Sequence, residues 1–159
     1  MQRIHGYLAE IELIQRLDNG DVFEPGARLM EYINFLGCSP TLRSGDTECQ
    51  IRLHYFNEVT GMGGESLEAI RFPGCGHVIR EPGKLLKICH LDRSWTCPEC
   101  ESTGKINNIN WRKSAGFSRL FIEISSIFPR EALPSDKLLD LLKLYAPADW
   151  RWFYSASSF

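Results

Sequence analysis

Two short pairs of cysteine and histidine residues place the strongest constraint on how this chain can fold. The first pair is Cys75-Gly-His77, and Cys97-Pro-Glu-Cys100 follows after nineteen residues. Two sulfurs on one tight turn can reach a single ion, and zinc prefers four sulfur or nitrogen ligands in a tetrahedron. The spacing therefore predicts one zinc ion bound by Cys75, His77, Cys97 and Cys100. Four protein ligands leave no open position for water or substrate, which favours a structural ion over a catalytic one.

Other cysteine and histidine residues offer alternatives to this ligand set. Cys89 and His90 are adjacent and lie midway along the same loop, so either can replace His77 or Cys75. Cys38 and Cys49 lie outside the loop. We interpret these two as free buried thiols, because free cysteine is among the most buried residue types and nothing indicates an oxidising compartment.

The run from Cys75 to Cys100 resembles the second metal site of RING fingers. It is more similar to the single-zinc variant of SUMO ligases, the SP-RING, through Cys75-Gly-His77 and Arg93-Ser-Trp-Thr-Cys97-Pro-Glu-Cys100. The resemblance implies the same four zinc ligands, with Trp95 packed beside them, and a ligase scaffold. A zinc ribbon, in which two hairpin turns supply the ligands, satisfies the same spacing. Both interpretations concern residues 75–100 alone.

Composition indicates an ordinary globular chain. With 159 residues and 43% hydrophobic residues, the chain can bury a core as one domain with an insertion. The start, MQRIHGYLAEIELIQRL, lacks the basic flank and continuous apolar run of a signal peptide. No later segment reaches the length of a membrane span. We therefore expect a cytoplasmic protein.

Two segments, 109 positions apart, share a helical pattern. Residues 24–38 place Leu29, Met30, Ile33 and Leu36 at helical spacing, with Pro25 before them. Residues 133–147 repeat the pattern, with Ser135 as the expected N-cap and Pro147 as the stop. This similarity predicts two copies of one helix.

Strand-like runs flank each predicted helix. Apolar residues alternate with polar ones over 11–17 and 51–55, and strand patterns also occupy 117–128 and 149–155. Two strand-helix-strand units predict an α+β fold, a ferredoxin-like antiparallel sheet built by internal duplication. We expect halves at 1–60 and 115–159, with a zinc-binding insertion at 61–114 between them. A metal can replace the core that so small an insertion lacks.

The insertion is also basic. From Arg71 to Arg119 there are nine basic and four acidic residues, while the rest of the chain has nine basic and sixteen acidic ones. Basic side chains can neutralise phosphates, and an exposed tryptophan can stack on an unpaired base. The candidate nucleic-acid contacts are Arg80, Lys84, Lys87, Arg93, Lys105, Trp111, Arg112 and Lys113.

These patterns favour a zinc-binding protein that acts by binding a macromolecule rather than by catalysis. The run Gly61-Met-Gly-Gly lacks the Gly-Lys-Ser/Thr ending of a phosphate loop, so no nucleotide or small-molecule cofactor is expected. The partner is a protein or a nucleic acid, and a homodimer is compatible with an exposed sheet. Two other functions stay open, a nucleic-acid-binding protein and an enzyme, either a RING-like ligase scaffold or a metalloenzyme.

Overall fold

The computed structural model describes residues 2–15, 20–36, 49–63, 69–87, 94–127 and 132–155. Four predicted positions, Cys38, Cys89, His90 and Arg93, lie outside these ranges. The chain divides into two compact units: unit 1 comprises Met1–His54 and Phe121–Arg151, and unit 2 comprises Tyr55–Leu120 and Trp152–Phe159. Within the described ranges, no helix has the length and apolar character needed to cross a membrane.

The helices of unit 1 bury one apolar stripe each. In α1 (Gln2–Glu10), Ile4 and Leu8 lie one turn apart and are buried, as are Leu138 and Leu142 in α4 (Asp136–Tyr145). The Ser135 side chain accepts a hydrogen bond from the Leu138 N–H and caps α4. The predicted second helix and its N-cap are therefore confirmed.

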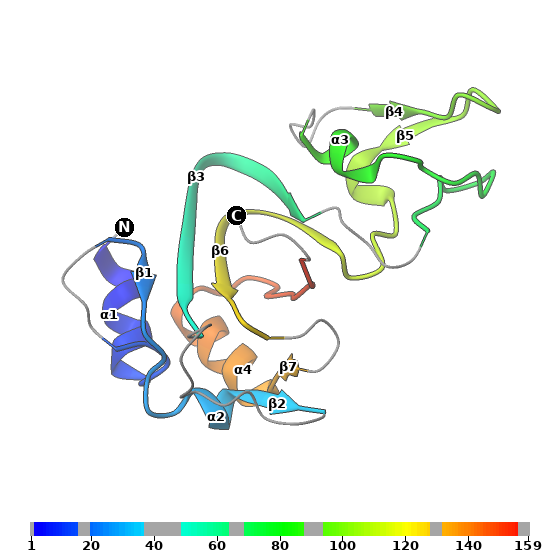
Figure 1. Cartoon of the computed structure of the whole chain (residues 1–159). Helices are drawn as coiled ribbons and strands as arrows, with labels where there is room; N and C mark the ends of the chain where they lie inside the picture. Colours follow the sequence, from blue (N-terminus) through cyan, green and yellow to red (C-terminus); the bar gives the residue numbers. More distant parts are fainter. Residues whose placement is uncertain are drawn as a thin grey trace. The chain divides into compact units, whose positions relative to one another are not determined.

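Strands β1 (Val22–Phe23), β3 (Ile51–Gly63) and β6 (Ala115–Ile124) form one sheet in the order β1-β3-β6 (Figure 1). A separate antiparallel pair joins β2 (Ile33–Phe35) to β7 (Ala132–Pro134). The strands predicted near 51–55 and 117–128 correspond to β3 and β6. The boundary between the two units falls within β3 and within β6.

Three other predicted elements differ from the structure. The first predicted helix is only α2 (Leu29–Tyr32), because the next three residues extend and pair with β7. The strand expected over 11–17 is not formed at residues 11–15, where only Ile14 makes a single bridge, to Pro25. Residues 149–155 likewise form no strand. The fold is thus mixed α/β with antiparallel pairing, and a ferredoxin-like duplication is not confirmed.

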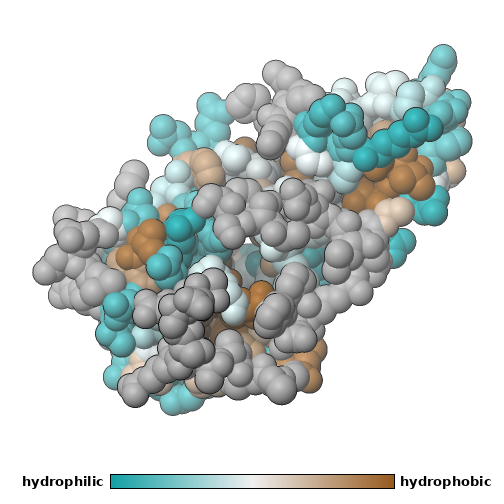
Figure 2. All heavy atoms as spheres, in the orientation of Figure 1, coloured by the Kyte–Doolittle hydropathy of each residue, from teal (hydrophilic) through white to brown (hydrophobic). Residues whose placement is uncertain are grey.

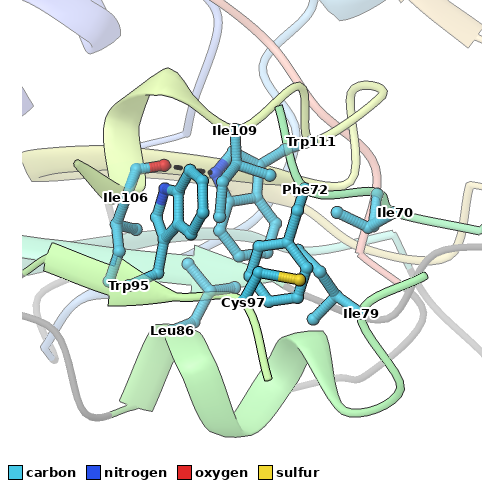
Figure 3. Packing of buried hydrophobic residues seen from close by; sticks show 9 residues of the cluster. All are labelled: Ile70, Phe72, Ile79, Leu86, Trp95, Cys97, Ile106, Ile109 and Trp111. Carbon is cyan, nitrogen blue, oxygen red and sulfur yellow. Dashed lines mark hydrogen bonds between the residues drawn. The ribbon is translucent and has the colours of Figure 1, made fainter. Parts of the chain in front are cut away.

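Unit 2 contains α3 (Pro82–Lys87), the antiparallel pair β4 (Ser94–Thr96) and β5 (Thr103–Lys105), and the 3-10 turn η1 (Ile106–Asn108). These short elements enclose one hydrophobic cluster, shown in Figure 3: Ile70, Phe72, Ile79, Leu86, Trp95, Cys97, Ile106, Ile109 and Trp111. Both buried indoles satisfy their N–H groups, because Trp95 donates to the Lys105 carbonyl and Trp111 to the Ile106 carbonyl.

Gly104 allows Trp95 to lie across the β4–β5 pair. The two residues face each other in the strand register. A Cβ atom at position 104 would lie 2.6 Å from Cζ2 of the Trp95 ring. Glycine is therefore required by the close approach of the indole to the opposite backbone.

Candidate metal centre

The first ligand pair lies on a hairpin turn between Ile70 and Ile79. The Ile79 N–H donates to the Ile70 carbonyl, and the Phe72 N–H donates to the His77 carbonyl. Gly74 and Gly76 alternate with the ligands at φ values of 93° and 73°, a region that glycine enters without steric strain. The turn therefore curls tightly around Cys75 and His77.

The second ligand pair lies on the turn that joins β4 to β5. The Cys97 N–H donates to the Ser102 carbonyl at 2.8 Å, and the Glu101 N–H donates to the Cys97 carbonyl at 2.9 Å. Glu101 has a φ of 58°, which reverses the chain after Cys100. Each of the two hairpins thus supplies one ligand pair.

The two turns bring all four predicted ligands together. One ligand atom from each of Cys75, His77, Cys97 and Cys100 lies within 4.8 Å of the other three. The Sγ atoms of Cys75 and Cys97 are 3.5 Å apart. Tetrahedral zinc with Zn–S bonds of about 2.3 Å places its sulfurs about 3.8 Å apart, so the cluster has the size and chemistry to hold such an ion.

The thiols of this cluster perturb one another. The Ser102 hydroxyl, 2.9 Å from the Cys100 Sγ, together with the Ser102 backbone and the Cys75 thiol, lowers the pKa of Cys100 to about 7. For Cys75 the His77 backbone acts to lower the pKa, but desolvation and the thiols of Cys100 and Cys97 outweigh it, so the pKa is raised. Crowded thiols therefore resist losing several protons together unless a cation compensates the charge.

Cys97 connects the metal cluster to the hydrophobic core. It is 0% exposed and belongs to the cluster that contains Phe72 and Trp95, whose ring centroids are 4.9 Å apart (Figure 3). His77 and Cys100, in contrast, are exposed, and Cys75 is half-buried. The site thus has one buried ligand and an open side toward solvent.

The part of the molecule that carries α3, β4 and β5 is largely hydrophilic on the face seen in Figure 2, with a smaller hydrophobic patch among the polar side chains. The exposed hydrophobic residue Val78, at 45% exposure, belongs to the first hairpin. The elements themselves are short, and a metal ion would add a cross-link between them to the packing of the hydrophobic cluster.

The predicted nucleic-acid contacts do not form one surface with their tryptophan. Trp111 is only 6% exposed and packs in the core, so it is not available to stack on a base. Lys84 of α3 pairs at 2.6 Å with Glu81, which immediately precedes the helix. Lys87 is the last residue of α3. Four other predicted contacts are exposed: Arg80, Lys105, Arg112 and Lys113.

The structure adds two residues that the sequence patterns did not identify. Ser102 contacts the Cys100 thiol, and its position immediately after the second turn was the available signal. Trp152 lies 3.6 Å, ring centroid to Nζ, from Lys113. The strand pattern over residues 149–155 predicts a strand at Trp152 and does not indicate this cation–π contact.

Comparisons with models of protein families, with curated proteins and with solved structures find no match for this chain.

Proposed function

We propose that the predicted insertion, residues 61–114, is a module held by one structural zinc ion and that it acts as a docking surface for a macromolecule rather than as an enzyme. The observation that carries the proposal is the convergence of Cys75, His77, Cys97 and Cys100, with ligand atoms within 4.8 Å of one another. Three sulfurs and one imidazole are a donor set that zinc prefers.

A structural role is supported by the number of ligands. Four protein ligands complete a tetrahedral shell, whereas catalytic zinc keeps a position for water or substrate. The presentation of each ligand pair on a separate hairpin supports a zinc-ribbon-like arrangement. When bound, the ion would cross-link two hairpins that pack around one hydrophobic cluster.

Metal analysis of the purified chain and its variants tests this proposal. We expect about one zinc per chain in the wild type and a large loss of bound zinc in Cys75→Ser, Cys97→Ser and Cys100→Ser, and in His77→Ala. Cys49→Ser is a matched control, because Cys49 is buried in unit 1 and outside the cluster. Cys89→Ser and His90→Ala test the alternative ligands and should retain zinc.

Cobalt substitution tests whether the shell is closed. A tetrahedral cobalt spectrum with thiolate charge-transfer bands, unchanged by added anions, is expected for four protein ligands. A five-coordinate spectrum, or one that shifts when anions are added, would contradict a structural site. Unchanged structure of the hairpins after zinc is stripped would also overturn the proposal.

A further inference from the structure

The turn that follows Trp111 presents two basic side chains in an unusual backbone conformation. Arg112 and Lys113 are consecutive, exposed, and have φ values of 49° and 57°. Residues other than glycine and asparagine rarely adopt this left-handed backbone region, and they keep it only where the surroundings enforce it. The surroundings therefore hold the backbone of this turn in one conformation.

Several hydrogen bonds enforce this turn. The Arg112 N–H donates to Oδ1 of Asn110 at 3.0 Å. The buried Ser114 donates to the Trp111 carbonyl through both its N–H, at 2.9 Å, and its hydroxyl, at 2.6 Å. Trp111 is buried in the core of unit 2, so these hydrogen bonds attach the basic turn to that core.

The C-terminal aromatic segment lies against the same turn. The Tyr154 N–H donates to the Lys113 carbonyl at 2.8 Å, and Nζ of Lys113 is 3.6 Å from the centroid of the Trp152 ring. The rings of Trp152 and Tyr154 are 5.2 Å apart at 69° and are only half-buried. Two partly exposed rings thus lie beside the basic turn and contact it at Lys113.

Gly63, the last residue of β3, allows β3 to lie close to both Ser114 and Phe153. A Cβ atom at position 63 would lie 2.2 Å from the Ser114 carbonyl oxygen and 3.0 Å from Cε2 of Phe153. Any other residue at position 63 would clash with the backbone that follows the basic turn. The surface is therefore built from three segments that are distant in sequence.

The two segments that supply the four side chains, residues 102–122 and 152–159, carry no acidic residue. From Ser102 to Ile122 the chain contains no acidic residue but four basic ones, Lys105, Arg112, Lys113 and Arg119, all exposed. Residues 152–159 contain no charged side chain. Such a region attracts a polyanion, and the half-exposed rings distinguish among polyanions, because unpaired bases can stack on them.

We infer that Arg112, Lys113, Trp152 and Tyr154 form a binding surface for single-stranded nucleic acid, with the cations on phosphates and the rings stacked on bases. A duplex hides its bases and an acidic protein supplies no bases to stack, so each would use only half of this chemistry. The inference goes beyond the zinc proposal and does not rest on it, since none of the four residues belongs to the Cys/His cluster.

Fluorescence anisotropy of a labelled oligothymidylate of about 12 nucleotides, titrated with the full chain at low salt, tests the inference. Trp152→Ala should weaken binding about tenfold, whereas Trp152→Phe retains a stacking ring and should lose much less. Lys113→Ala should reduce the slope of log Kd against log salt by about 0.7, the contribution of one phosphate on a single strand.

Two variants in unit 1 provide matched controls. Trp150 is also half-buried, but its indole N–H donates to the Ala146 carbonyl at the end of α4, so Trp150→Ala should bind like the wild type. Lys143→Ala removes an exposed charge from α4 and should leave the salt slope unchanged.

Three results would overturn the inference: no binding at low salt, wild-type affinity in a folded Trp152→Ala, or equal competition by duplex DNA or polyglutamate. The last result would assign the surface to simple polyanion or acidic-protein binding. If circular dichroism shows that Trp152→Ala does not fold, Lys113→Glu serves instead. It should weaken binding more than tenfold, and unchanged affinity would be equally decisive against the surface. Wild-type zinc content alongside any of these failures would leave the zinc proposal intact.

Discussion

The two units of this chain differ in the length of their helices and in the contacts that connect their segments. The two longest helices in the described part of unit 1, α1 and α4, have nine and ten residues. Tyrosine hydroxyls connect its segments, because Tyr7 donates to the Leu141 carbonyl and Tyr32 to the Ile11 carbonyl. Unit 2 has shorter helices and two small hairpins around a nine-residue core, into which the metal-ligand cluster extends through Cys97. In the described part of unit 1, no such Cys/His cluster is found.

The difference shows how element length decides what must supply stability. An amphipathic helix of nine or ten residues can bury more apolar surface than a hairpin with three-residue strands, and so offsets more of the entropy of ordering the chain. A metal ion can supply on the order of 10 kcal/mol of apparent folding free energy to a small site. If this comparison is right, the two units should respond differently to metal removal and to core mutation.

Metal removal should produce the largest effect. After chelation we expect amide hydrogen exchange to accelerate strongly in residues 70–79 and 94–105, because the ion no longer joins the two hairpins. Exchange in α1 and α4 should change little. Hydrogen exchange with mass spectrometry measures both regions in one sample. Equal acceleration in both units would contradict the prediction that the metal stabilises unit 2 alone.

The reciprocal control is Leu8→Ala in unit 1. Leu8 is 0% exposed, so the truncation should lower the free energy of unfolding by about 2–5 kcal/mol. It should increase exchange in α1 and α4 while zinc content stays at the wild-type level. Loss of zinc in this variant would indicate that the units are not independent in this respect.

Gly104→Ala should have an intermediate effect that is confined to unit 2. The new methyl group would meet the Trp95 ring at 2.6 Å, and relieving that overlap should cost about 1–3 kcal/mol of unfolding free energy. Gly83→Ala, within α3, is the matched control: its Cβ meets nothing within 4 Å, so the variant should be neutral or slightly more stable. Urea denaturation followed by tryptophan fluorescence compares them, and equal midpoints would show that Trp95 can move at no cost.

The smallest expected effect is a loss of stability in unit 1 at acidic pH, where Glu31 becomes protonated. Hydrogen bonds from Arg28 and Lys137 lower the pKa of Glu31 from 4.5 to about 2. Because the folded-state pKa is the lower one, this interaction stabilises the fold fully above pH 4.5 and is lost as the pH falls from about 4.5 through about 2. The group is exposed, so the increment should be small and weakened by salt.

Amide exchange of α2 and α4 over this pH range measures that increment. Glu31→Gln should show a flatter pH dependence than the wild type, and high salt should make the two chains alike. A wild-type pH dependence in Glu31→Gln would mean that other carboxyls are responsible.

Local patterns predicted the features that depend on local chemistry. The spacing of Cys75, His77, Cys97 and Cys100 was enough to identify the cluster that the structure brings together, because turn geometry fixes each pair. The N-cap at Ser135 was predicted for the same reason, since a cap is a contact between residues three positions apart.

Features that depend on distant partners were missed. Residues 33–35 continue a helical pattern, yet pairing with residues 132–134 extends them into β2, a case of tertiary contacts overriding local periodicity. Trp111 and Trp152 look equally available in the sequence, but one is enclosed by the core of unit 2 and the other lies half-buried beside Lys113. No spacing rule distinguishes these two environments.

The burial of Cys97 has a kinetic consequence for a bound metal ion. His77 and Cys100 are exposed, so a chelator would reach their bonds to such an ion directly. Cys97 is enclosed by the hydrophobic cluster, so its bond would become accessible only when that cluster opens. Opening of the core would therefore limit the rate of metal release, and the dissociation rate of the ion would report the rate of local unfolding in unit 2.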